Sequence, residues 1–271
     1  MSRWPLLAPG GSLVRHRALL VTFTVRELKG RYRGSVLGFF WSLLQPLLLL
    51  LVYSFVFGHI FQPRVAGAEP YPLFLVSGLF PWIWFSTSLT EGAMSLTANS
   101  GLIRRSIFPI ELLPSVAVMS NMIHFLLAMP VLAAGLAWGR HEGFDVGGWG
   151  LFALPLVVLF QMPLVAGCAL GLSALHAHFK DVRDLLTSGL TLLMFLTPIF
   201  YPIDAVQIPV LRWVVRLAPT TPYTLAYQQA IFEGRFPAPE LWLQMGLFGV
   251  AGWLVGCFVF VRLRDTLVEA L

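Results

Sequence analysis

A run of cations near the start of the chain has the composition of an anion-binding site. Its members are Arg26, Lys29, Arg31 and Arg33. Arginine and lysine bind phosphate and carboxylate groups, arginine often through two parallel hydrogen bonds. The run also precedes a long uncharged stretch that begins at Ser35, and cations in that position anchor a protein at the membrane and set its topology. Two interpretations stay open, an anchor and a contact with the anionic headgroup of a substrate.

A second polar cluster occupies residues 176–184, which read HAHFKDVRD. Four of its side chains are of the types that ligate metal ions or transfer protons, namely His176, His178, Asp181 and Asp184. Lys180 and Arg183 lie among them, would pair with the aspartates and would repel a metal cation. We therefore predict no metal site and no catalytic residue on this chain. A membrane enzyme acting on lipid-linked sugars, the alternative, would have to use this cluster.

Glu91 is the only acidic residue well inside a predicted apolar span. Carboxylates within a membrane are costly and usually face a bundle interior or a wet cavity. Glu91 therefore either lines a pathway or lies where its span reaches the interface. In an ion-coupled secondary transporter it would be the ion site, but such a protein should also show an internal repeat, and none is evident.

The composition is that of a polytopic membrane protein. Of the 271 residues, 57% are hydrophobic and 11% are charged, and the mean hydropathy is +0.78. A soluble domain would have roughly 25% charged residues. The net charge of +5 does not indicate nucleic acid, because the cations lie beside apolar stretches where anionic membrane lipids attract them.

The apolar stretches predict an all-α fold with six transmembrane helices. We place them near Ser35–Phe61, Tyr71–Leu96, Leu113–Trp138, Trp149–Leu175, Leu185–Phe200 and Leu241–Val261. Residues 1–34 precede them as a separate region, comprising a loose cytoplasmic tail over Met1–Gly11 and an amphipathic helix over Leu13–Arg33 that would lie in the membrane interface. Residues 35–271 form the transmembrane domain.

The distribution of cations predicts that both termini are cytoplasmic. Thirteen of the 18 Lys and Arg residues then lie in cytoplasmic segments, and five lie outside: Arg64, Arg140, Arg212, Arg216 and Arg235. This excess follows the positive-inside rule.

Two connecting segments differ from ordinary loops. Residues 99–114, NSGLIRRSIFPIELLP, alternate apolar and charged side chains, and predict a short helix that either docks on another protein or lies on the headgroups. Residues 201–234 contain four prolines among apolar residues, which is typical of short helices that dip partway into the membrane.

Aromatic residues and glycine pairs mark three of the spans. The aromatic residues, Tyr71, Phe80, Trp82, Trp84 and Phe85, belong either to an interfacial belt or to a surface on which sugar rings stack. Gly167 with Gly171, and Gly252 with Gly256, permit close packing of helices, within the chain or between copies. No Walker-type phosphate-binding motif is present, so energy must come from a partner or from an ion gradient.

The chain resembles the ABC-2 type permeases that export bacterial polysaccharides, the membrane subunits of O-antigen, capsule and teichoic acid exporters. The similarity lies in RELK and RYRGSVLG of residues 26–38 with Trp41 and Pro46, RRSIFP of 104–109, FKDVRD of 179–184 and TPIFYP of 197–202. These motifs occur in order over nearly the whole chain.

The resemblance implies a role for each segment. The coupling helix to a soluble ATPase would comprise Leu102, Ile103, Arg104, Arg105, Phe108 and Glu111. The cations near the pyrophosphate of a lipid-linked polysaccharide would be Arg26, Lys29, Arg31 and Arg33, with Tyr32. Re-entrant gate helices would include Pro198, Tyr201, Pro202, Pro219 and Pro222.

The same resemblance implies an assembly of two copies of this chain with two ATPase subunits in the bacterial inner membrane. The sugar chain would pass between the copies along the aromatic residues. This chain would carry no cofactor, and ATP and Mg²⁺ would bind the ATPase. The sequence departs from the family pattern before the last span: where such permeases often show Asn-Pro and then an arginine, this chain has Pro219-Thr220-Thr221-Pro222 and Gln228.

Overall fold

The computed structural model describes residues 8–56, 68–105 and 109–267, and within these ranges the chain is helical and contains no strand. Among the described residues, four helices are long and apolar enough to cross a membrane: α4 (Tyr71–Ala98), α6 (Leu112–His141), α7 (Leu154–His178) with the short turn before it, and α11 (Pro239–Leu263) with the turn after it. The prediction of an all-α chain with several apolar spans is therefore confirmed.

The first and fifth predicted spans correspond to shorter helices. These are α3 (Trp41–Phe55) and α8 (Val182–Leu196), each of 15 residues. Residues 57–61, the end of the first predicted span, lie outside the described residues. The count of six spans stays a prediction.

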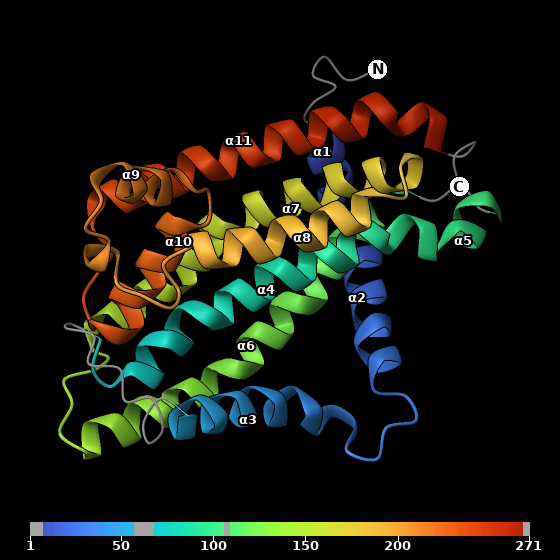
Figure 1. The fold of residues 1–271 in the computed structure, drawn as a ribbon. Coiled ribbons are helices and arrows are strands. Elements are labelled where there is room, and N and C mark those ends of the chain that lie inside the picture. Colours follow the sequence, from blue (N-terminus) through green and yellow to red (C-terminus); the bar gives the residue numbers. More distant parts are fainter. Residues whose placement is uncertain (1–7, 57–67, 106–108, 268–271) are drawn as a thin grey trace.

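The long helices run alongside one another, and α2 (Arg17–Arg31) lies across them (Figure 1). The short helix α5 (Ser100–Arg105) lies at one end of the bundle, and α9 (Pro209–Leu217) and α10 (Thr221–Tyr227) lie at the opposite end. The proline-rich segment therefore forms short helices, as predicted, and they are far from the segment predicted to couple to an ATPase.

The amphipathic region consists of two helices where the sequence predicts one. The first, α1 (Ala8–Arg15), includes residues expected to be a loose tail, and His16 separates it from α2. Helical hydrogen bonds continue across the junction, since the amide of Leu20 donates to the carbonyl of His16 at 3.0 Å. On α2, Thr24 packs against the bundle while Val21 and Val25 are exposed, which suits a helix whose apolar face meets lipid.

The centre of the bundle is α4, which packs against both α6 and α7. Most of its side chains are buried on every side, and Trp84 is 1% exposed. Because lipid tails are as apolar as leucine, such helices are held by close packing and internal hydrogen bonds more than by exclusion from water. Two buried hydroxyls of α4 accordingly donate to backbone carbonyls of the preceding turn, Ser77 to Phe74 at 2.6 Å and Ser95 to Gly92 at 2.7 Å.

The two glycine pairs meet within one chain. A β-carbon on Gly256 of α11 would overlap the backbone of Gly167 on α7, and one on Gly171 would approach the Cα of Gly256 to 3.0 Å. The prediction that these pairs allow close helix packing is confirmed, and the contact is intramolecular.

Candidate functional site

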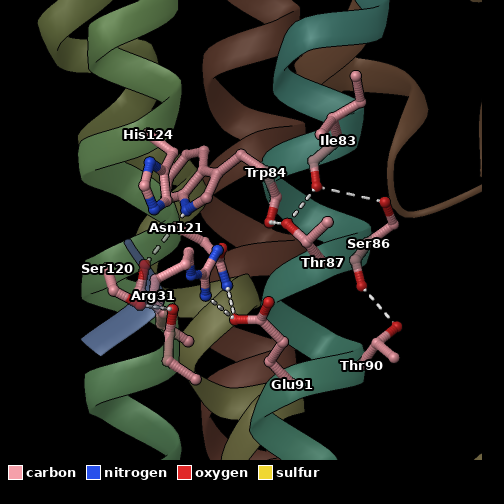
Figure 2. Close-up of polar contacts among 12 residues, drawn as sticks. Arg31, Ile83, Trp84, Ser86, Thr87, Thr90, Glu91, Ser120, Asn121 and His124 are labelled. Atoms are coloured by element: carbon pink, nitrogen blue, oxygen red, sulfur yellow. Dashed lines mark hydrogen bonds and ion pairs between the residues drawn. The ribbon is translucent and has the colours of Figure 1, made fainter. Parts of the chain in front are cut away.

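A partly buried polar cluster joins the end of α2 to the centre of the bundle. The Arg31 guanidinium donates to the Glu91 carboxylate on α4 at 2.7 Å and to the amide oxygen of Asn121 on α6 at 3.2 Å. The amide nitrogen of Asn121 donates to the same Glu91 oxygen at 2.7 Å. The three side chains form a closed triangle (Figure 2), so Arg31 and Glu91, predicted separately, belong to one site.

Local backbone conformation at the end of α2 places these side chains. Arg31 is the last residue of α2, and Gly34 and Gly38, with φ of 81° and 49°, turn the chain into α3. These left-handed conformations are readily adopted by glycine. The turn brings Tyr32 beside α3, where its hydroxyl hydrogen-bonds to the Ser42 hydroxyl.

His124 extends the cluster along α6. Its Nδ1 lies 3.1 Å from the Tyr32 hydroxyl and 3.4 Å from that of Ser42, and its ring meets the Tyr32 ring edge-on. Asn121 and His124 are three residues apart and therefore share one face of α6. Four helices, α2, α3, α4 and α6, each contribute a polar side chain to this region.

The Arg31–Glu91 pair lies between two hollows. The first, which we call the α3 cavity, has a volume of about 550 Å³ and lies between α3, α4 and α6; its lining includes Ser42, Gln45, Thr87 and His124. The second, the α5 hollow, has a volume of about 680 Å³ and reaches Asn99 and Leu102 near α5. Arg31 and Glu91 line both. Glu91 therefore lines two hollows of this chain, and both placements expected from the sequence, on a pathway or at the interface, stay predictions.

The other predicted headgroup residues are arranged along α2 and its end. Arg26 lines the α5 hollow, and Lys29 and Arg33 are exposed. Tyr32 lines the α3 cavity together with Arg31. The structure thus brings Arg31 and Tyr32 together at the cavity and leaves Lys29 and Arg33 on the surface.

The five predicted channel aromatics are all buried within this chain. Phe80 and Trp84 line the α3 cavity, and the Trp84 ring stacks on Phe125 with 5.4 Å between centroids. Trp82 packs against Phe85, and the Tyr71 hydroxyl donates to the Phe200 carbonyl at 2.8 Å. A role for these residues in stacking sugar rings stays a prediction.

The predicted coupling residues lie on or near α5. Ile103 is buried with residues of α6 and α7, Leu102 lines the α5 hollow, and Glu111, just before α6, is 3% exposed. Arg104 and Arg105 end α5. Phe108 lies outside the described residues.

Hydrogen bonds fasten the predicted gate segment to the end of α8. The Gln228 amide donates to the Pro198 carbonyl at 2.8 Å, and the Thr197 and Thr220 hydroxyls lie 2.6 Å apart. The Tyr201 hydroxyl donates to the backbone of α8. Pro222 is buried in the first turn of α10, and Pro202 and Pro219 are half-buried in the loops. Gln228, part of the departure from the family pattern, therefore has a structural role.

The histidine and aspartate side chains of residues 176–184 are not grouped around a common site. His178 has a partner at each ring nitrogen, the Ala174 carbonyl at 2.9 Å and the Thr266 hydroxyl at 2.8 Å, while Asp181 and Asp184 are exposed. Within residues 8–56, 68–105 and 109–267, no three His, Cys, Asp or Glu side chains are grouped to hold a metal ion.

Sequence reasoning did not identify Asn121, His124 or Ser42 as site residues. A signal was present, because an amide and an imidazole three positions apart within a predicted apolar span are costly unless they have polar partners.

Comparison with known proteins identifies the family. The model of the ABC-2 type transporter family matches residues 18–232. The chain is 32% identical to the O-antigen export system permease protein RfbA of Myxococcus xanthus, covering 96% of this chain and 97% of that one. It is 30% identical to RfbA of Klebsiella pneumoniae (93% and 95% covered), and 26% identical to the polysialic acid transport protein KpsM of Escherichia coli (67% and 69%). The chain therefore belongs to the ABC-2 type transporter family.

Proposed function

We propose that this chain is the membrane subunit of an ATP-driven exporter that moves a lipid-linked polysaccharide across the bacterial cytoplasmic membrane. The observation that carries the proposal is the similarity, over nearly the full length of both chains, to proteins named O-antigen export system permeases. The similarity to polysialic acid transport proteins supports the same class of cargo. The chain is a permease and not an enzyme, and a separate ATPase binds ATP and Mg²⁺.

The active assembly contains two copies of this chain and two ATPase subunits. In each copy, α3 and α8 supply the first and fifth of six spans, with both termini in the cytoplasm. The exposed apolar side chains of α8, Leu185, Leu192 and Phe195, support a location in lipid or against the second copy, because they have no cover within the described chain.

Transport begins at the cations of α2 and of the turn that follows it, and ends at the short helices α9 and α10. Arg26, Lys29, Arg31 and Arg33 attract the pyrophosphate of the lipid carrier, since guanidinium and ammonium groups at an interface attract phosphate more strongly than in bulk water. Closure of the ATPase subunits on ATP moves α5 and the loop containing Phe108, and a path opens for the sugar chain. The segment of α9 and α10 closes that path at the outer end.

The proposal is tested by deleting the gene and following the polysaccharide in cells. Deletion should leave lipid-linked polysaccharide on the cytoplasmic face and remove it from the cell surface. Re-expression of the chain should restore surface polysaccharide only in cells that also contain an active ATPase. Normal surface polysaccharide in the deletion strain would contradict the proposal.

The ATPase contact is tested with Phe108→Asp, which places a charge in the predicted docking segment. Co-purification of the ATPase should be lost. The matched control is Phe144→Asp, at an exposed position beyond the far end of α6, which should retain the ATPase. Retention by both variants would remove this docking role.

A further inference from the structure

We propose that Glu91 is an internal anion that occupies the phosphate position at Arg31, and that the phosphate of the lipid carrier displaces it. Asn121 donates to whichever anion is bound. This inference rests on the proposed function and assigns roles to Glu91 and Asn121 within its headgroup site.

Two donors on different helices meet at one Glu91 oxygen, and both could equally donate to a phosphoryl oxygen. That oxygen accepts from the Arg31 guanidinium and from the Asn121 amide, both at 2.7 Å. Donors on different helices, aimed at one anionic oxygen, are the arrangement that proteins use for phosphate. A phosphoryl oxygen in place of this carboxylate oxygen would receive both hydrogen bonds without movement of α2 or α6.

Further polar groups line the cavity that a phosphate bound to Arg31 would enter. Tyr32, Ser42 and Gln45 line the α3 cavity next to Arg31, and hydroxyl and amide groups can donate to the remaining phosphate oxygens. Away from them the cavity is lined by apolar side chains such as Leu49 and Phe80. A polar end beside an apolar wall fits a phosphate that carries a hydrocarbon chain.

Charge balance requires that the phosphate replaces the Glu91 carboxylate at Arg31 and is not simply added beside it. With Glu91 paired to Arg31, the cluster is neutral, which limits the cost of holding ions within a helix bundle. A phosphate bound to Arg31 beside an ionised Glu91 would be repelled by the carboxylate. The phosphate therefore binds as Glu91 leaves.

The structure provides a place for the displaced carboxylate. The Glu91 side chain is 38% exposed and lines the α5 hollow as well as the α3 cavity. Arg26 lines the same hollow, so the displaced carboxylate would have another cation nearby. Return of Glu91 to Arg31 would then release the phosphate.

The experiment measures binding of farnesyl diphosphate to the permease–ATPase complex in nanodiscs of zwitterionic lipid. Glu91→Gln keeps the side-chain shape and removes the competing charge, so affinity should rise about tenfold. Arg31→Gln should lower affinity by at least about tenfold because it removes the charged donor. Asn121→Asp should also weaken binding, since it replaces a donor by a second carboxylate.

The matched control is Glu27→Gln, which removes the same charge from another acid of the α5 hollow and should leave affinity within about twofold, as expected for a screened surface charge. Glu91→Ala serves as a second variant, with the same direction of change, if Glu91→Gln does not fold. If Glu91 only holds Arg31 in position, both Glu91 variants will weaken binding, and that result overturns the inference.

Binding of two further ligands distinguishes the phosphate of a lipid carrier from that of a bilayer lipid. Inorganic pyrophosphate should show the same order of variants at lower affinity, because it lacks the hydrocarbon chain. If phosphatidylglycerol shows this order and farnesyl diphosphate does not, the ligand is a bilayer lipid and the assignment to the carrier is wrong. Export by the unmodified complex and by Glu27→Gln is measured in parallel, so that failure of the proposed function is recognised separately.

Discussion

Gly256 of α11 lies directly against Gly167 of α7, with no room for a β-carbon on Gly256 beside the Gly167 backbone. Each glycine thus lets the other helix approach, and α7 and α11 form the most extensively packed pair among the described helices. In a bilayer, where exclusion from water contributes little between helices, such close packing is a principal source of stability.

Gly256→Ala should therefore destabilise the protein, because the methyl group forces α7 and α11 apart. Overpacking of a tight interface costs about 1–3 kcal/mol. Thermal unfolding of the purified protein in detergent measures the change. The control is Gly189→Ala on α8, where a β-carbon would meet no atom within 4 Å; equal melting temperatures for the two variants would show that the contact is not close.

Substitution of Arg31, at the end of α2, and of Arg33, just after it, should affect export and thermal stability differently. Arg33 is exposed, so Arg33→Gln should lower export and leave the melting temperature unchanged. Arg31→Gln should lower both, because the Glu91 carboxylate then loses its ion pair and keeps only the Asn121 amide. Because the two side chains are 29% and 38% exposed, loss of the pair costs about 0.2–1 kcal/mol.

The double variant Arg31→Gln, Arg33→Gln should insert into the membrane and lose most export. Membrane fractionation and surface polysaccharide are the two measurements. Unchanged export would leave these cations with an anchoring role alone.

Gln228 should be needed to keep the segment of α9 and α10 closed. Gln228→Leu removes the only donor described for the Pro198 carbonyl in the visible part of the chain, and an unsatisfied buried carbonyl costs about 1–3 kcal/mol. We expect faster leakage of a small fluorescent dye from proteoliposomes without ATP. Gln207→Leu, at an exposed position of the same segment, is the control, and equal leakage from the two would contradict a gating role for Gln228.

Much of the fold was predictable because hydropathy depends on short stretches of sequence. The long apolar stretches located α4, α6, α7 and α11 to within a few residues, and the prolines after α8 indicated short helices. The junction at His16 was not predictable, because the hydrogen-bond pattern continues across it.

The site was predictable only in parts. Arg31 and Glu91 each stood out as charges next to or within apolar segments, but they are 60 residues apart, and nothing local relates them. Their pairing depends on how α2 crosses the bundle. The aromatic residues of α4 were ambiguous for a similar reason, since α4 is central and buries side chains on every face.

The most direct test of the account is transport by purified components in proteoliposomes. This chain and its ATPase are reconstituted together, and movement of a lipid-linked polysaccharide into the lumen is measured with and without ATP. We predict transport only with both proteins and ATP, and none with this chain alone or with an ATPase that cannot hydrolyse ATP. Transport or chemical conversion of the substrate by this chain alone would contradict the account.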